Sequence, residues 1–224
     1  MMISFPMLVQ KYGIKTKGVV HVGAHWAEEH EEYLAQGIEY FIYIEPCEKA
    51  FRVLHEKFHD DENVIRIQRA CSDYTGKAIM YTGDNTINHG QSNSLLRPDK
   101  HLQLHPEVAF DGEEEVTVDT LSNLISKLNP PKFGGVAWFR NFKLLVMDTQ
   151  GTEGRVIRGA NVILGYFDYV YTEINFDSVY ENCTRAEELD LLLHDFERVE
   201  TGVKVGGMWS DALYIRKSLL ECSV

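Results

Sequence analysis

The sequence predicts an α/β fold with a doubly wound, mostly parallel seven-stranded sheet and a C-terminal antiparallel hairpin. Short apolar runs alternate with helix-like segments along most of the chain, which is typical of a parallel sheet covered on both faces. A glycine ends the first apolar run, and a carboxylate ends the second about 20 residues later. A Gly206-Gly207 turn separates the last two runs, which indicates a hairpin.

The opening unit, from Gly18 to Glu45, has the size of a strand–turn–helix–strand module that binds nucleotides. Its first run, residues 18–22, stops at Gly23, where the lack of a side chain lets a ligand lie against the backbone. Its second run, residues 40–44, stops at Glu45, where a carboxylate can accept both hydroxyls of a ribose. This pair predicts a site for an adenosine-type ligand.

The residues after this glycine favour one such ligand over another. A dinucleotide site needs G-x-G-x-x-G, because a pyrophosphate must lie against the backbone and a helix N-terminus. Residues 23–27 hold one glycine, and glutamates follow at positions 28, 29, 31 and 32. In the first turn of the predicted helix these acids would repel a phosphate but suit a sulfonium and an ammonium. The sequence therefore favours S-adenosylmethionine over NAD.

The middle of the chain continues the alternation and then loses it. Apolar residues at helical spacing predict a helix after Pro46, and residues 64–67 predict a third strand that leads to Ser72 and Asp73. Residues 78–81 are expected to form a small extra strand. From residue 83 to residue 112 the periodicity vanishes, which predicts a long loop and a possible substrate lid, since a loop of this length is usually functional.

The pattern resumes with a strand over residues 115–118, and Asp119 is expected to cap a helix that runs through Leu128. Asn129-Pro130-Pro131 is expected to stop that helix. The remaining expected elements are a buried strand over residues 143–148, a short helix ending near Gly159, a strand over 169–174, a helix over 186–194, and a hairpin formed by residues 196–205 and 212–215.

Composition limits the class of protein. The 224 residues are expected to form a single domain, 1–224, with enough apolar content (44%) for a buried core. A formal net charge of −12 argues against a nucleic-acid partner, because phosphates are bound by clustered lysine and arginine. No run is long enough for a membrane span, and four cysteines without a C-x-x-C pattern favour a reduced, cytoplasmic protein. Nothing in the sequence indicates an oligomeric state.

Six short motifs, in order along nearly the whole chain, resemble those of the FkbM family of Rossmann-like class I methyltransferases. They are residues 21–25, 43–46, 147–153, 158–160, 172–175 and 210–214. The resemblance implies an S-adenosylmethionine-dependent methyltransferase that acts on a hydroxyl of a sugar or another small metabolite. Three positions depart from the family pattern: His21 stands where aspartate is common, Ala27 where glycine is common, and Gln150 where glutamate is usual.

Ligands of open α/β sheets bind beyond the carboxyl ends of the strands, which defines the candidate site residues. Gly23, Ala24 and His25 are expected to bind the cofactor, the first two through their backbone, and Glu45 is expected to bind the ribose. Ser72 and Asp73 are expected near the adenine, and Asp148 near the methionine end. Glu173 also ends a predicted strand.

Methyl transfer to oxygen needs alignment of the acceptor and a group that takes its proton. The expected catalytic residues are His25, Asp148 and His105, with His25 best placed as the base and His89 more simply explained as an exposed loop residue.

The run from His55 to His59 matches H-E-x-x-H, a zinc-binding pattern when both histidines share one helix face. Here the helix already buries Leu54 and Phe58, which turns His59 toward solvent, so no metal site is predicted. A non-catalytic S-adenosylmethionine-binding module remains an alternative because of Ala27 and Gln150, and an NAD-linked oxidoreductase is a weaker one.

Overall fold

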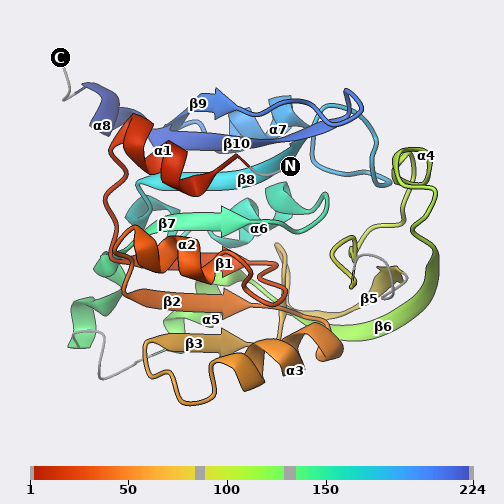
Figure 1. Cartoon of the computed structure of the whole chain (residues 1–224), viewed down its shortest axis with the longest axis horizontal. Coiled ribbons are helices and arrows are strands. Elements are labelled where there is room, and N and C mark those ends of the chain that lie inside the picture. The colour runs from red at the N-terminus through yellow and green to blue at the C-terminus, as the bar shows by residue number, and fades with distance from the viewer. Residues whose placement is uncertain (1–2, 84–88, 129–134, 222–224) are drawn as a thin grey trace.

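The computed structural model describes residues 3–83, 89–128 and 135–221. Its main sheet has the strand order β3-β2-β1-β7-β8-β10-β9, and β10 runs antiparallel to both of its neighbours while the other pairs are parallel (Figure 1). This arrangement confirms the predicted fold class, including the hairpin. The strands are β1 (Gly18–Val22), β2 (Tyr40–Ile44), β3 (Val64–Ile67), β7 (Phe142–Met147), β8 (Tyr169–Asn175), β9 (Phe196–Thr201) and β10 (Trp209–Arg216).

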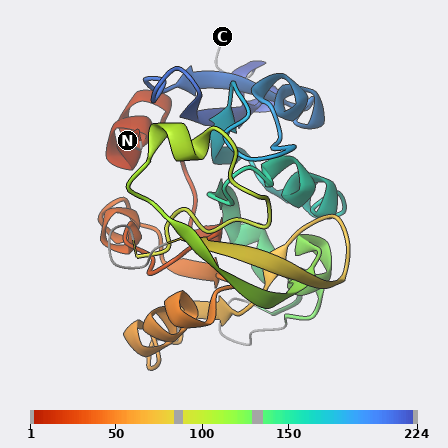
Figure 2. The same cartoon turned by 90° about the vertical axis from the view of Figure 1, so that its right-hand side faces the viewer.

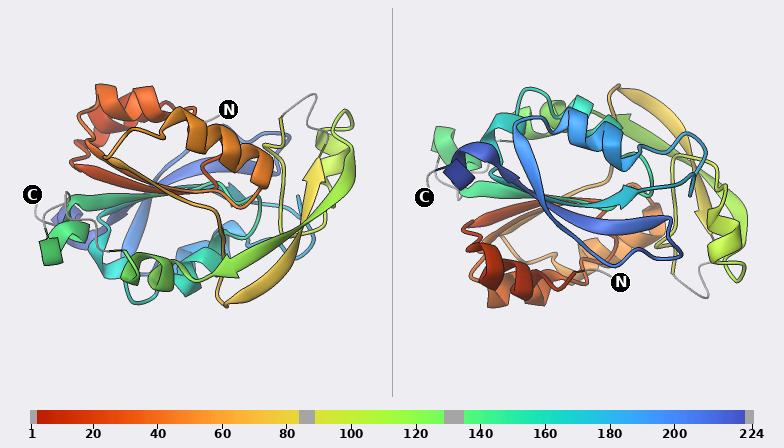
Figure 3. Two further views of the ribbon diagram at one scale, coloured as in Figure 1. Left: turned by 90° about the horizontal axis from the view of Figure 1, so that it is seen from below. Right: turned by 90° about the horizontal axis from the view of Figure 1, so that it is seen from above.

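Helices cover both faces of this sheet (Figure 3). One face carries α1 (Phe5–Tyr12), α2 (His30–Ala35) and α3 (Glu48–Lys57). The other carries α5 (Leu121–Ser126), α6 (Glu153–Gly159) and α7 (Ala186–Leu192), with the short 3-10 helices η2 (Gly135–Asn141) and η3 (Leu164–Tyr166). The last helix, α8 (Lys217–Glu221), follows β10 directly.

The core has two layers because side chains alternate across each strand. On β1, Val20 and Val22 pack in the layer under α5, α6 and α7, whereas Val19 packs in the layer under α1, α2 and α3. The central strand β7 is buried on both faces, and its first residue, Phe142, is fully buried against the ring of Trp138. Strands buried in this way read as continuous apolar runs, which is why the sequence predicts them well.

A second, three-stranded sheet of order β4-β6-β5 lies across the carboxyl ends of the main strands (Figure 2). Its strands are β4 (Ala70–Cys71), β5 (Gly76–Gly83) and β6 (Phe110–Asp119), so β5 and β6 are longer than the predicted 78–81 and 115–118. In β6 the exposed positions Asp111, Glu113 and Glu115 alternate with only partly buried ones, which hides the strand pattern in the sequence.

The predicted loop 83–112 is therefore shorter in the structure, because β6 begins at Phe110, and it contains the single-turn helix α4 (His101–Leu104). Residues 84–88 lie outside the described residues. The described part of the segment is tied down at both sides. Ser94 exchanges two backbone hydrogen bonds with Tyr81 on β5 (2.8 and 3.1 Å), and the amide of Asp99 donates to the carbonyl of Val179 after β8 (3.0 Å).

The predicted N-cap of α5 was wrong by one residue. Thr120 is the cap, and its hydroxyl accepts a hydrogen bond from the amide of Asn123 (3.2 Å). The carboxylate of Asp119 instead accepts the amide of Thr120 and pairs with Lys127 (both 2.8 Å). The helix ends at Ser126, and the predicted stop at residues 129–131 lies outside the described residues.

Candidate functional site

A cavity of about 310 Å³ opens at the carboxyl ends of β1, β2, β7 and β8. The segment 90–95 and α4 form its outer wall (Figure 2). This volume is at the lower end of the range of small-molecule sites. Of the predicted site residues, those that line the cavity are Gly23, Ala24, His25, Glu45, His105, Asp148 and Glu173.

Gly23 lies at the sharp turn that ends β1. Its φ of +79° is in the left-handed region, and a Cβ atom built on it would lie 1.9 Å from the backbone oxygen of Asp148. Its amide and that of Ala24 both donate to the carbonyl of Ile44 on β2 (2.9 and 3.1 Å). The turn is therefore held between β2 and β7, and only glycine fits at this position.

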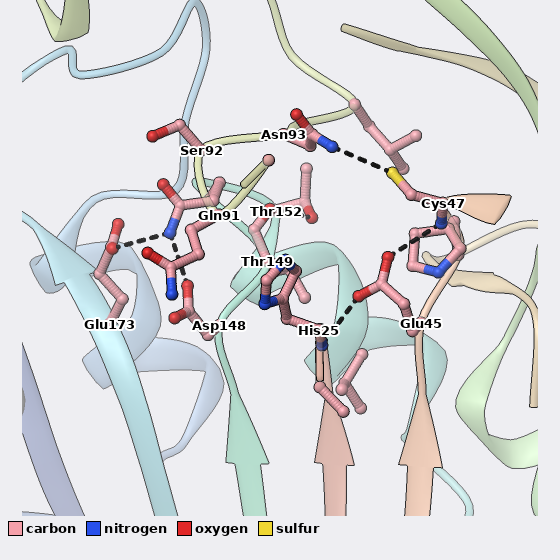
Figure 4. A pocket seen from close by; sticks show the side chains of 18 of the residues that line it. His25, Glu45, Cys47, Gln91, Ser92, Asn93, Asp148, Thr149, Thr152 and Glu173 are labelled. Carbon is pink, nitrogen blue, oxygen red and sulfur yellow. Dashed lines mark hydrogen bonds between the residues drawn. The ribbon is translucent and has the colours of Figure 1, made fainter. Parts of the chain in front are cut away.

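Glu45 forms the wall at the end of β2. Its side chain is 6% exposed, and its two carboxylate oxygens accept backbone hydrogen bonds from His25 (3.0 Å) and Cys47 (2.9 Å) (Figure 4). Burial raises the pKa of Glu45 to about 6, although these two bonds oppose the shift. Each oxygen keeps a further lone pair, so the carboxylate has the acceptor capacity for two ribose hydroxyls.

His25 is fixed by two acceptors. Its Nδ1 lies 2.7 Å from a carboxylate oxygen of Glu28 and its Nε2 lies 3.0 Å from the carbonyl of His89. Burial lowers the pKa of His25, but these hydrogen bonds outweigh it and leave the pKa raised. Because both ring nitrogens face acceptors, both carry protons in this arrangement, and neither is free to take a proton from a substrate.

The predicted first-turn position of the glutamates needs a correction at this point. Helix α2 begins at His30, so Glu28 precedes it and pairs with His25, while Glu31 and Glu32 occupy the first turn. The positive φ values of His25 and Ala27 (46° and 50°) delay the start of the helix.

Asp148 belongs to a buried polar network at the end of β7. The amide nitrogen of Gln150 donates to Asp148 (2.6 Å) and to Glu173 at the end of β8 (3.2 Å), and its oxygen accepts the hydroxyl of Tyr180 (2.7 Å). Figure 4 shows Asp148 and Glu173 on one side of His25 and Glu45 on the other. Gln150, where the family usually has glutamate, thus holds two carboxylates side by side. Burial raises the pKa of Asp148.

Ser72 and Asp73 do not line the cavity. Strand β4, which ends at Cys71, pairs with β6, and the chain leaves the cavity after it. Ser72 is fully buried beneath α6, where its carbonyl oxygen would lie 2.1 Å from a Cβ on Gly159, and Asp73 pairs with Arg158 (3.3 Å). The residues just before them line the cavity instead: Arg69, Ala70 and Cys71.

Two histidines, one in α4 and one directly after it, border the cavity. His105, half-buried, contacts Glu107 through Nδ1 (3.2 Å). His101 is buried, and its Nε2 lies 3.1 Å from the hydroxyl of Ser92. Burial and, to a lesser degree, the neighbouring His105 lower the pKa of His101 to about 4. The packing of His101 against the ring of Tyr180 distinguishes it from an exposed loop histidine.

Other lining residues were also missed as site residues. Trp209 and Asp211 come from β10, and Cys47, Gln91 and Asn93 also line the cavity. Asp211 lies in one of the family-like motifs, which was the available signal. The other lining residues carry no such signal in the sequence, because they reach the cavity only through tertiary folding.

The predicted H-E-x-x-H segment does not form a zinc site. Helix α3 ends at Lys57, so His59 lies beyond it, with a side chain that is 64% exposed and bonded to Asp60 (2.8 Å). Within residues 3–83, 89–128 and 135–221, no three histidine, cysteine or acidic side chains are grouped so as to hold a metal ion. No helix in the same ranges has the length and apolar character needed to cross a membrane.

The buried carboxyls predict an unusual pH dependence of stability. Burial raises the pKa of Glu153 and of Asp211 to about 7 each. The folded chain therefore holds protons that the unfolded chain has released, and stability should rise as the pH falls from about 8 to about 6.5, by about 1 kcal/mol per group. Below that range His21 and His101, whose pKa burial lowers to about 4, act in the opposite direction.

Urea unfolding at a series of pH values measures this effect. The Asp211→Asn variant should lose part of the slope between about pH 8 and about pH 6.5, while replacement of the exposed Glu181 by glutamine should leave it unchanged. A wild-type stability that falls over this window would contradict the assignment.

The side chains fit S-adenosylmethionine. Glu45 presents a buried, anchored carboxylate at the wall, and the acids Glu28, Glu29 and Asp148 line the same cavity, whereas Arg69 is the one lysine or arginine among its described lining residues. Such a lining favours a cationic sulfonium over a pyrophosphate.

Comparison with known proteins gives the family. Residues 19–199 match the profile of the Methyltransferase FkbM domain. The 2-O-methyltransferase NoeI of Sinorhizobium fredii (strain NBRC 101917 / NGR234) is 27% identical over 158 residues, which cover 69% of this chain and 61% of that relative, so the chain spans less than two thirds of its length.

Solved structures of similar shape include a putative tRNA (m1A22) methyltransferase of Streptococcus pneumoniae (13% identity, 96% of this chain and 71% of that one, TM-score 0.49). Another is the magnesium protoporphyrin IX methyltransferase of Synechocystis PCC 6803 (9% identity, 95% and 76%, TM-score 0.49). Both TM-scores lie below 0.5, so the assignment depends on the profile match over residues 19–199. That match confirms the predicted family and, with it, S-adenosylmethionine as the cofactor. This chain belongs to the FkbM methyltransferase domain family.

Proposed function

We propose that this protein transfers a methyl group from S-adenosylmethionine to a hydroxyl of a sugar or of another small hydroxylated metabolite. The observation that carries the proposal is one continuous cavity that joins the anchored carboxylate of Glu45, above β2, to the carboxylates of Glu173 and Asp211, above β8 and β10. Its span from β2 to β10 would place the cofactor at one end and the acceptor at the other.

The cofactor end would be built around β1 and β2. Glu45 would accept the ribose hydroxyls, and the backbone of Gly23 and Ala24 would form the floor. When bound, the cofactor supplies a methyl group activated by a positively charged sulfur. Asp148, on the next strand of the sheet, would face the methionine end, where its carboxylate attracts positive charge. The apolar side chains of Cys71 and Met80 line the cavity beyond Glu45 and would contact the adenine in place of Ser72 and Asp73.

The acceptor end would lie above β8 and β10. Carboxylates accept hydrogen bonds from hydroxyl groups, and the ring of Trp209 offers a flat apolar surface for the carbon face of a sugar. The same carboxylates would repel a polyanion, so we propose a small neutral acceptor and not a nucleic acid. The name of the similar S. fredii protein, a 2-O-methyltransferase, supports oxygen as the methylated atom.

The predicted lid remains part of this proposal, but it is shorter than the sequence predicted. The described part of the segment 83–112 borders the cavity through Gln91, Ser92 and His105. Closure of this segment would exclude water from the acceptor end. His105 would then serve the acceptor, whereas His25 would fix the position of the segment through its bond to the carbonyl of His89.

We expect S-adenosylhomocysteine to bind with micromolar or tighter affinity and NAD not to bind, because the turn at Gly23 lacks the glycines and the positive surroundings that a pyrophosphate needs. Isothermal titration calorimetry with both ligands measures this. Formation of S-adenosylhomocysteine from S-adenosylmethionine, followed with a panel of mono- and oligosaccharides and phenols, then tests the activity. Tight NAD binding would overturn the proposal, and cofactor binding without turnover on any acceptor would favour a non-catalytic binding module.

A further inference from the structure

Two acidic residues occupy opposed positions on neighbouring strands at the hairpin end of the main sheet. Glu173 on β8 and Asp211 on β10 are direct partners in the antiparallel register. Side chains at such positions lie on the same face, with Cβ atoms about 4.5–5.5 Å apart. Both line the cavity, and they are 7% and 4% exposed, so neither is well solvated.

Hydrogen-bond donors hold this pair, which has no ion pair with any described residue. Glu173 accepts the amide of Gln150 (3.2 Å) and a longer bond from Asn175 (3.4 Å), and Asp211 accepts the backbone amide of Ile3 (3.2 Å). The titratable side chains around the pair add negative charge or none: Asp148 from β7, Glu153 from α6, Tyr171 from β8, Tyr180 from the loop after β8, and Glu29 elsewhere on the cavity wall. The positive charge of the N-terminal amino group opposes their effect at Asp211.

Two poorly solvated carboxylates at directly opposed positions of a sheet cannot both ionise at low cost, so we expect the pair to retain a proton near neutral pH. In agreement with the geometry, burial and the neighbouring acids raise the pKa of Glu173 well above its usual value, and burial and Asp148 raise the pKa of Asp211 to about 7. A proton acceptor is most effective when it titrates near the working pH.

The histidines of the site are less suited to this task. Both ring nitrogens of His25 already face acceptors, and His101 has its Nε2 against Ser92 and is too weak a base. His105 is half-buried and bonded to Glu107. The cofactor end is fixed by Glu45 above β2, so an acceptor beyond the methyl group would lie above β8 and β10, next to the carboxylate pair.

We propose that the Glu173–Asp211 pair is the catalytic base, and that it takes the proton of the acceptor hydroxyl through the Asp211 carboxylate. This inference rests on the proposed methyl transfer. As the hydroxyl O–H bond breaks, its proton goes to the carboxylate and its electron pair forms the new oxygen–methyl bond. The two electrons of the broken carbon–sulfur bond stay on sulfur. The negative charge of the carboxylate and the positive charge of the sulfonium are therefore neutralised together.

Proton release on cofactor binding tests the pair without an acceptor. A sulfonium nearby should drive a proton off the pair, whereas the uncharged sulfur of S-adenosylhomocysteine should not. Calorimetry at neutral pH in two buffers of different ionisation enthalpy should give more proton release with S-adenosylmethionine than with S-adenosylhomocysteine. The double variant Glu173→Gln, Asp211→Asn should abolish that difference, and the exposed control Glu181→Gln should keep it.

The second measurement is turnover on an acceptor that the panel of saccharides and phenols has identified. Asp211→Asn should lower kcat by at least 100-fold while the Kd of S-adenosylhomocysteine changes less than threefold. Glu173→Gln removes the like charge beside Asp211, so the acidic limb of its kcat–pH profile should move to lower pH, a shift that a purely structural role would not cause.

An unchanged difference in proton release in the double variant, or full turnover by Asp211→Asn, would overturn the carboxylate base. A wild-type protein that binds neither cofactor form, or that turns over no acceptor, would overturn the proposed function instead. Thermal unfolding of each variant identifies any that fails to fold, and the single isosteric variants then replace the double variant in the proton-release measurement.

Discussion

Replacement of Gly23 by alanine should abolish S-adenosylhomocysteine binding and lower the free energy of unfolding by about 2–5 kcal/mol. The new Cβ would lie 1.9 Å from the backbone oxygen of Asp148, and the residue would also have to keep a φ of +79°. The clash involves main chain on both sides, so a side-chain rotation cannot relieve it. Relief would have to separate the ends of β1 and β7, which form the floor of the cavity.

The chain offers a matched control for the backbone part of this effect. Gly37 has a φ of +80° but no atom within 4 Å of its ideal Cβ, so Gly37→Ala should cost only about 1–2 kcal/mol and leave cofactor binding intact. Urea unfolding and calorimetry on both variants separate strain from clash. If the two variants lose the same stability and both still bind the cofactor, the close approach to Asp148 is not what makes Gly23 necessary.

The site residues that could be predicted from the sequence are those at the ends of buried strands. Strands β1 and β7 are buried on both faces, so each is a continuous apolar run with a clear end. Gly23 and Asp148 directly follow these two strands, Glu45 directly follows β2, and the parallel order of these strands brings all three residues to one edge of the sheet. Their presence in one cavity could therefore be predicted without knowledge of side-chain packing.

The features that sequence reasoning missed depend on contacts between distant segments. The two bonds that make His25 a poor base come from Glu28 and from the carbonyl of His89, 64 residues away. The pairing of Glu173 with Asp211 is set by the register of a hairpin strand on β8, and no spacing in the sequence encodes it.

The adenine wall shows the same limit. Ser72 and Asp73 follow a strand-like run, and by the rule of strand ends they belong at the site. Strand β4 instead leaves the main sheet to pair with β6, a partner about 50 residues further along, and takes both residues away from the cavity. A two-residue strand carries too little periodicity to reveal which sheet it joins.

Replacement of Glu45 by glutamine should weaken S-adenosylhomocysteine binding by about 1.5–3 kcal/mol, or roughly 10- to 150-fold, because charged hydrogen bonds to the ligand are lost. Glutamine is the sharper change, since alanine would also leave the amides of His25 and Cys47 without their acceptor and so reduce stability. The exposed Glu39, just before the same strand β2, provides the control: Glu39→Gln should bind as the wild type does.

The pH dependence of binding separates a ribose contact from a general effect of charge. Burial raises the pKa of Glu45 to about 6, so a wild-type protein titrated below that value should bind S-adenosylhomocysteine progressively more weakly as the carboxylate gains a proton. The Glu45→Gln variant has no such group, and its weaker affinity should stay nearly constant over the same range. An unchanged Kd in the variant at neutral pH would place the ribose elsewhere in the cavity, and a parallel pH dependence in both proteins would assign the titration to another residue, such as His25, which holds the same turn.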